Sequence, residues 1–168
     1  ASDNRSQIIY APEAFICNKQ YYENEYQVFD ITRTRDSQHY TLRLPLLGEY
    51  QRQNITTVCA IADFLHENTP LSISRRAFVE GLRECDTITG FRGRWDIIST
   101  SPKIICDTAH NAHGLEKVAA QLKKLGKPFV IVVNSADPQS TSAQRVKRQV
   151  EEKYGVATVL VNCLEMDK

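Results

Sequence analysis

The C-terminal half of the chain alternates apolar segments with amphipathic ones, and this alternation limits the possible folds more than any other feature. The segments "PFVIVVN" (128–134) and "ATVLVN" (157–162) are almost wholly apolar, as strands buried on both faces of a sheet are. Between them, "SAQRVKRQVEEKYG" (142–155) has the period of an amphipathic helix and ends at a glycine. Apolar strands joined by helices predict an α/β fold here, with a Rossmann-like, largely parallel sheet.

The N-terminal part has a different pattern. Three segments are rich in β-branched and aromatic residues and predict strands of a small antiparallel sheet, or the rim of a larger one: "SQIIYA", "EYQVFDITR" and "HYTLRLPLL". The polar stretch "NKQYYENE" between the first two is predicted to be a turn.

Helical spacing begins near Glu49 and continues to Asn68, and "ISRRAFVEGLREC" predicts a second helix with Ser72 or Ser74 as its N-cap. The segment "DTITGFRGR", with two glycines, predicts a loop or hinge. We therefore expect a strand-rich and two-helix segment over residues 1–88 and an α/β domain over 89–168, with "WDIIS" and "KIICDT" as the first strands of that domain.

Composition excludes several classes of protein. The 168 residues carry a net charge of +1, which gives no general attraction to nucleic acid or to an anionic membrane. The chain has neither an apolar run long enough to cross a bilayer nor a secretory leader, so we expect a cytoplasmic location. Its five scattered cysteines predict reduced thiols and no metal site.

Polar residues gather where the "KIICD" strand should end and a helix should begin. Ligands of open α/β sheets bind beyond the carboxyl ends of the strands, and Asp107, His110 and Asn111 fall there. A carboxylate at this edge can accept hydrogen bonds from ribose hydroxyls, an imidazole can stack on a base, and Arg94 can reach a phosphate. The alternative is that Asp107 only caps the helix and His110 is a surface residue.

A second candidate lies in "LLGEYQRQN", where Gly48 ends a strand and Asn54 lies within about the first turn of the following helix. An amide there can recognise the edge of an adenine. The alternative is that Asn54 faces solvent and Gly48 only makes a turn.

Taken in order, "LLGEYQRQN", "GRWD" and "DTAHN" resemble the motifs of the folylpolyglutamate synthase and dihydrofolate synthase family, within the ATP-dependent Mur ligase group. The resemblance covers about residues 1–125 and implies that residues 1–88 are the end of a central ATP-binding domain. One departure is Tyr50, where the family pattern has histidine.

The resemblance implies a role for each site residue. Asn54 would contact adenine, Arg94 the phosphates and Asp107 the ribose, while His110 packs against the nucleotide and Asn111 shapes the loop. It also implies the reaction, in which ATP with Mg²⁺ converts the carboxylate of dihydropteroate or folate to an acyl phosphate that the amine of glutamate attacks.

No phosphate-binding P-loop motif occurs in the 168 residues, so we expect a fragment without catalytic residues of its own and without activity alone. Incomplete sheets would leave exposed edges suited to self-association. The tail, about residues 122–168, resembles the stage IV sporulation protein A family, whose members hydrolyse nucleotides. The alternatives are therefore a non-catalytic or engineered chimeric α/β module, a fragment of a sporulation-coat nucleotide hydrolase, or a ligase with a divergent C-terminus.

Overall fold

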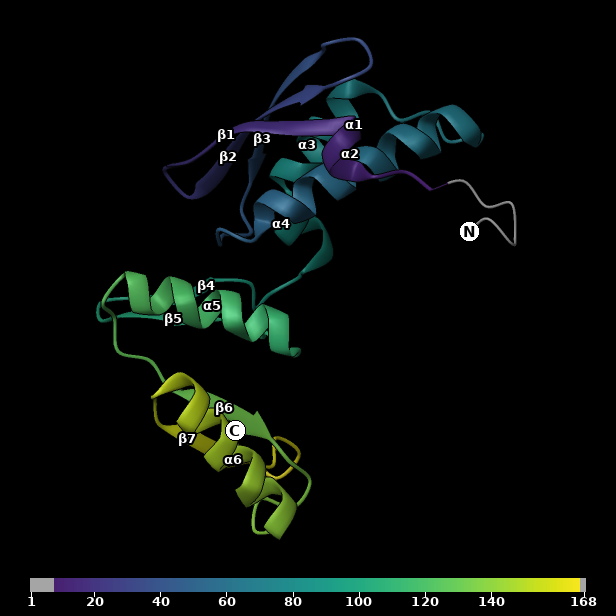
Figure 1. Ribbon diagram of the computed structural model, residues 1–168. Helices are drawn as coiled ribbons and strands as arrows, with labels where there is room; N and C mark the ends of the chain where they lie inside the picture. Colours follow the sequence, from purple (N-terminus) through teal and green to yellow (C-terminus); the bar gives the residue numbers. More distant parts are fainter. Residues whose placement is uncertain (1–7, 167–168) are drawn as a thin grey trace. The chain divides into compact units, whose positions relative to one another are not determined.

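The computed structural model describes residues 8–166, and the chain forms two compact units, one up to Ala109 and the other from His110 on (Figure 1). Each unit combines helices with short sheets, which confirms the α/β class. The expected domain boundary between residues 88 and 89 falls inside the first unit, and as a statement about domains it stays a prediction. No helix within residues 8–166 is long and apolar enough to span a membrane.

The first unit is built on an antiparallel sheet of three strands in the order β1 (Phe15–Glu23), β2 (Tyr26–Arg33) and β3 (His39–Leu44). The expectation of a small antiparallel sheet is confirmed. The short helix α1 (Ala11–Ala14) precedes β1.

Two local predictions in this sheet were wrong. Of the predicted strand "SQIIYA" (6–11), residues 6 and 7 lie outside the described residues, and residues 8–10 are not a strand. The segment "NKQYYENE", predicted to be a turn, supplies most of β1. Backbone pairing with β2 holds β1 in place, so the polar side chains of its second half need no buried partners. The turn itself is short and includes Asn24 in the left-handed conformation (φ +53°), which asparagine tolerates.

Helix α2 (Gln51–Asn68) packs against the sheet, and the core between them includes Phe29, Ile31, Leu42 and Ile55. The predicted helix after it is α3 (Arg75–Arg83), and the Ser74 hydroxyl caps it by accepting a hydrogen bond from the Ala77 N–H at 3.1 Å. The short helix α4 (Cys85–Thr89) follows, where part of a loop was predicted.

Strands β4 (Asp96–Thr100) and β5 (Lys103–Cys106) pair antiparallel in a hairpin. The expectation that they belong to a parallel sheet was wrong for this pair. Only Ser101 and Pro102 separate them, whereas two parallel neighbours need a crossover of roughly a dozen residues.

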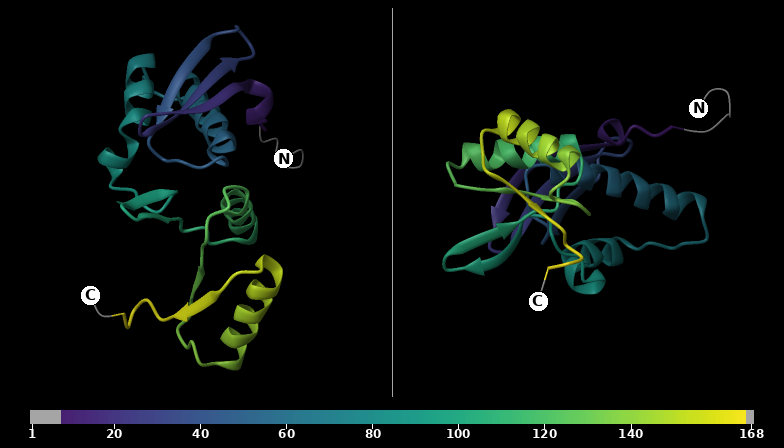
Figure 2. Two further views of the ribbon diagram at one scale, coloured as in Figure 1. Left: turned by 90° about the vertical axis from the view of Figure 1, so that its left-hand side faces the viewer. Right: turned by 90° about the horizontal axis from the view of Figure 1, so that it is seen from below.

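The second unit contains α5 (Ala112–Lys124), β6 (Ile131–Asn134), α6 (Thr141–Tyr154) and β7 (Thr158–Val161). Strands β6 and β7 pair in parallel, and α6, which connects them, packs against β7 (Figure 2). Here the expected parallel β-α-β arrangement is confirmed. Gly155 ends α6 in the left-handed conformation (φ +64°), as the sequence predicts.

Candidate functional site

Asp107 follows β5 directly, and its carboxylate receives two hydrogen bonds on one oxygen. The Tyr50 hydroxyl donates to Oδ2 at 2.7 Å, from a residue 57 positions earlier at the start of α2. The Trp95 backbone N–H donates to the same oxygen at 3.0 Å. Both donors are uncharged, so they orient the carboxylate without neutralising it.

The turn before β4 directs the Trp95 N–H toward Asp107. Gly93 (φ +82°) and Trp95 (φ +50°) both adopt the left-handed region, which costs a non-glycine residue such as Trp95 about 1 kcal/mol or more. The Gly93 carbonyl accepts hydrogen bonds from the Thr108 N–H and from its hydroxyl, each at 2.9 Å. A Cβ at Gly93 would lie 2.8 Å from Thr108 Cγ2, so this close approach requires glycine.

Arg94 belongs to the same group of residues. Its Nη1 donates to the Thr108 hydroxyl at 2.6 Å and to the Gly93 carbonyl at 3.1 Å. The guanidinium also lies 5.6 Å from the centre of the Phe91 ring. The structure thus places Arg94 next to Thr108, the neighbour of Asp107, and we call Tyr50, Gly93, Arg94, Trp95, Asp107 and Thr108 the Asp107 cluster.

Asn54 lies in the first turn of α2, four residues after Tyr50 and therefore on the same side of that helix. It is exposed, and its amide donates to Gln51 Oε1 at 2.8 Å. The alternative that Asn54 faces solvent is consistent with this exposure.

The other two predicted site residues belong to the second unit. His110 is exposed. Asn111 is the N-cap of α5, and its Oδ1 accepts a hydrogen bond from the Gly114 N–H at 2.8 Å. Since Asn111 performs the capping, the alternative that Asp107 caps this helix was wrong.

Tyr50 is the site residue that sequence analysis missed. Burial, followed by the hydrogen bond to Asp107 and the charge of that carboxylate, raises the pKa of Tyr50 well above its usual value. The phenol therefore stays protonated and remains a donor. The only signal in the sequence was the departure of this position from the family pattern.

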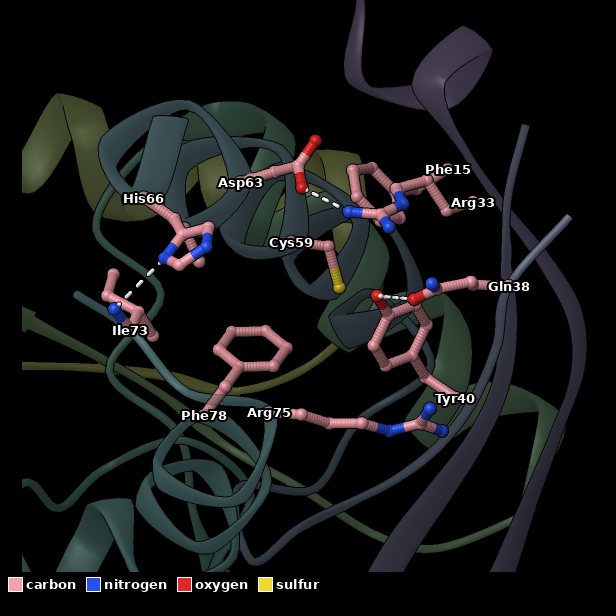
Figure 3. Close-up of a pocket in the computed structure, with 11 residues that line it drawn as sticks. Phe15, Arg33, Gln38, Tyr40, Cys59, Asp63, His66, Ile73, Arg75 and Phe78 are labelled. Atoms are coloured by element: carbon pink, nitrogen blue, oxygen red, sulfur yellow. Dashed lines mark hydrogen bonds and ion pairs between the residues drawn. The ribbon is translucent and has the colours of Figure 1, made fainter. Parts of the chain in front are cut away.

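A cavity of about 200 Å³ lies elsewhere in the first unit (Figure 3). Aromatic side chains line it, together with Arg33 and Asp63, which contact each other at 2.5 Å. Arg33 also contacts Asp36 at 2.5 Å. His66 accepts a hydrogen bond from the Ile73 N–H at 3.2 Å. None of the five predicted site residues is among those that line this cavity.

Metal ligation finds no support in the described part of the chain. Over residues 8–166, no three His, Cys, Asp or Glu side chains gather closely enough to hold an ion.

Comparisons with known proteins agree with the motifs. The solved structure of an FPGS–AMPPCP–folate complex superposes with a TM-score of 0.63 at 23% identity, over 89% of this chain and 35% of that one. The chain has the fold of the folylpolyglutamate synthases. The dihydrofolate synthase/folylpolyglutamate synthase of Bacillus subtilis (strain 168) is 28% identical over 117 residues, which are 69% of this chain and 26% of that protein.

A second similarity begins in β4. The family model for the ATPase domain of stage IV sporulation protein A matches residues 96–168. Stage IV sporulation protein A of Clostridioides difficile (strain 630) is 38% identical over 53 residues, 32% of this chain and 11% of that protein. The chain therefore resembles two kinds of protein, as the sequence analysis predicts, and it spans about a quarter of the folate-ligase relative.

Proposed function

We propose that this chain is part of a cytoplasmic, ATP-dependent ligase that adds glutamate to dihydropteroate or folate through an acyl phosphate. Its contribution is to hold the nucleoside part of ATP. One observation carries the proposal: the Asp107 carboxylate is oriented by two uncharged donors and lies beside a residue that binds the Arg94 guanidinium. The similarity to folate ligases supports the substrate class.

Each predicted site residue has a task in this proposal. The Asp107 carboxylate accepts a hydrogen bond from a ribose hydroxyl. Arg94 makes its contacts to Thr108 and Gly93 through Nη1, so its Nε and Nη2 donors suit a phosphate oxygen. Asn54 contacts adenine from the first turn of α2, and His110 packs against the nucleotide. Asn111 shapes the loop, a role that its cap on α5 supports.

Catalysis requires groups that the 168 residues lack, since no P-loop occurs among them. When bound, Mg²⁺ would neutralise charge on the phosphates of ATP. The chain's own residues bind and orient the nucleotide, and we expect no turnover from the chain alone.

Saturation-transfer difference NMR with millimolar ATP tests the proposal on the full chain. We expect transfer to the ribose protons in the wild type and loss of that transfer in Asp107→Ala. The matched control is Asp86→Ala, which removes a half-buried carboxylate whose hydrogen-bond partner is Thr87. ATP should raise the melting temperature little, because contacts of the P-loop kind are lacking. Absence of transfer in the wild type, or equal transfer in Asp107→Ala, would contradict the proposal.

A second candidate is favoured by the match of residues 96–168 to the sporulation ATPase domain. The chain would then be a chimeric α/β module, non-catalytic or derived from a nucleotide hydrolase after about residue 122, and its nucleotide contacts would lie in the second unit. Asn134, at the end of β6, would contact the base. This candidate predicts that Asn134→Ala reduces the saturation transfer to ATP and that Asp107→Ala does not. The ligase proposal predicts the reverse.

A further inference from the structure

Neighbouring residues in the first unit fix the position of Tyr50. Gly48, two residues earlier, is buried and left-handed (φ +118°), and a Cβ there would come within 2.6 Å of Tyr50 Cε1. The Gly48 carbonyl accepts a hydrogen bond from the Gln51 N–H at 3.0 Å, which fixes the turn into α2. The phenol therefore reaches Asp107 from a rigid helix start.

The two donors on Asp107 limit how a ligand can bind it. A carboxylate oxygen offers about two lone pairs, and Oδ2 already accepts from the Tyr50 hydroxyl and the Trp95 N–H. A hydroxyl of a ligand is therefore expected to meet Oδ1. The phenol remains a donor at all pH values near neutrality, because its pKa is raised.

We infer that Tyr50 is a positioning residue for the nucleotide: by holding Oδ2 of Asp107, it leaves Oδ1 as the one oxygen that the ribose can reach. The oxygens of the 2′ and 3′ hydroxyls lie too close together for each to meet its own lone pair on a single oxygen, so Oδ1 receives one of them. This inference rests on the proposed function. It goes further by naming a specificity: where the site receives one hydroxyl, the binding affinity depends unequally on the 2′ and 3′ hydroxyls of the ribose. A site that received both hydroxyls would depend on each.

Binding constants of the full chain for ATP, 2′-deoxy-ATP and 3′-deoxy-ATP, from NMR titration, test the inference. In the wild type we expect one deoxy analogue to bind about 5-fold more weakly than the other, the effect of one lost hydrogen bond. In Tyr50→Phe, ATP should bind about 3- to 10-fold more weakly and the difference between the analogues should shrink. Tyr40→Phe is the control, because it removes a hydroxyl that donates to Gln38 at 3.0 Å instead.

A spectroscopic measurement separates positioning from general stability. The Tyr50 hydroxyl proton, bonded to a carboxylate, should give a slowly exchanging downfield proton resonance. That resonance should be absent in Tyr50→Phe and Asp107→Ala but present in Tyr40→Phe. Tyr50→His, which restores the residue of the family pattern, should recover part of the ATP affinity if its ring N–H reaches Oδ2.

The outcomes distinguish the two proposals. If the wild type binds no ATP, the proposed function fails and the inference fails with it. If Asp107→Ala weakens binding while the two deoxy analogues bind the wild type equally, the inference is overturned and the proposed function stands. Should Tyr50→Phe not fold, the comparison of the analogues on the wild type decides alone.

Discussion

Two groups of charged residues in the first unit use their charges in opposite ways. Around the cavity, Arg33 contacts Asp36 and Asp63, and Arg35 contacts Asp63 at 3.0 Å and also Glu67. In the Asp107 cluster the carboxylate receives a phenol and a backbone N–H, while Arg94 donates to a hydroxyl and a carbonyl.

Under the proposed function, this difference separates structural charges from charges that bind a ligand. A carboxylate paired with guanidinium groups is largely compensated within the protein and has little left to offer a ligand. Uncharged donors orient a carboxylate but leave its charge in place. Among the described residues, Asp107 and Arg94 form no ion pair with each other, so a nucleotide with both hydroxyls and phosphates can use both groups.

The largest expected effect is a loss of stability on removing a charged residue beside the cavity. Arg33→Ala should lower the free energy of unfolding by about 2 kcal/mol, between the values typical of exposed and buried ion pairs, because it leaves the half-buried Asp63 with one guanidinium fewer. Urea denaturation measures this change. Arg43→Ala, which removes an exposed arginine paired with the exposed Glu23, should leave stability nearly unchanged. If Arg33→Ala were equally neutral, the cavity charges would not be structural.

A smaller effect is expected at the turn of the Asp107 cluster. Gly93→Ala should cost about 1–2 kcal/mol, from the left-handed backbone and from the clash with Thr108, and it should weaken ATP binding by displacing the Trp95 N–H. Gly90→Ala is the matched control, because Gly90 is also left-handed (φ +65°) but has open space around it. It should cost only about 1 kcal/mol and leave ATP binding intact. Equal effects of the two variants on binding would show that the turn does not orient Asp107.

The smallest effects are expected on the pH dependence of stability. In a plot of melting temperature against pH, the charged residues around the cavity should control the acid limb and the Asp107 cluster the alkaline limb. The hydrogen bond from Arg33 lowers the pKa of Asp36, and that from Arg35 lowers the pKa of Glu67. Their contribution is present above the unfolded pKa of about 4 and is lost as the pH falls through the folded value. Arg33→Ala should therefore flatten the acid limb of a plot of melting temperature against pH.

The alkaline limb of the same plot depends on a group whose pKa is raised rather than lowered. The pKa of Tyr50 is raised by burial and by Asp107, so its contribution is complete below the unfolded pKa of about 10 and is lost as the pH rises toward the folded value. Tyr50→Phe should flatten the alkaline limb and leave the acid limb unchanged. If both variants changed the same limb, the two groups would not be electrostatically separate.

Sequence patterns predicted the elements whose signals are local. The period of α2, the Ser74 cap of α3 and the β6-α6-β7 arrangement ending α6 at Gly155 all followed from neighbouring residues. The failures were also local in origin. The polar residues of β1 led to the prediction of a turn. The apolar character of β4 and β5 suggested parallel strands, although a connection of two residues cannot join a parallel pair.

The sequence by itself determined the α/β class and singled out Asp107, Arg94 and Asn54, because residue type and spacing express these features over a few positions. Only the tertiary structure decided that Tyr50 holds Asp107 across 57 residues. A hydrogen bond between distant segments depends on how the chain folds back, and no local pattern encodes that geometry.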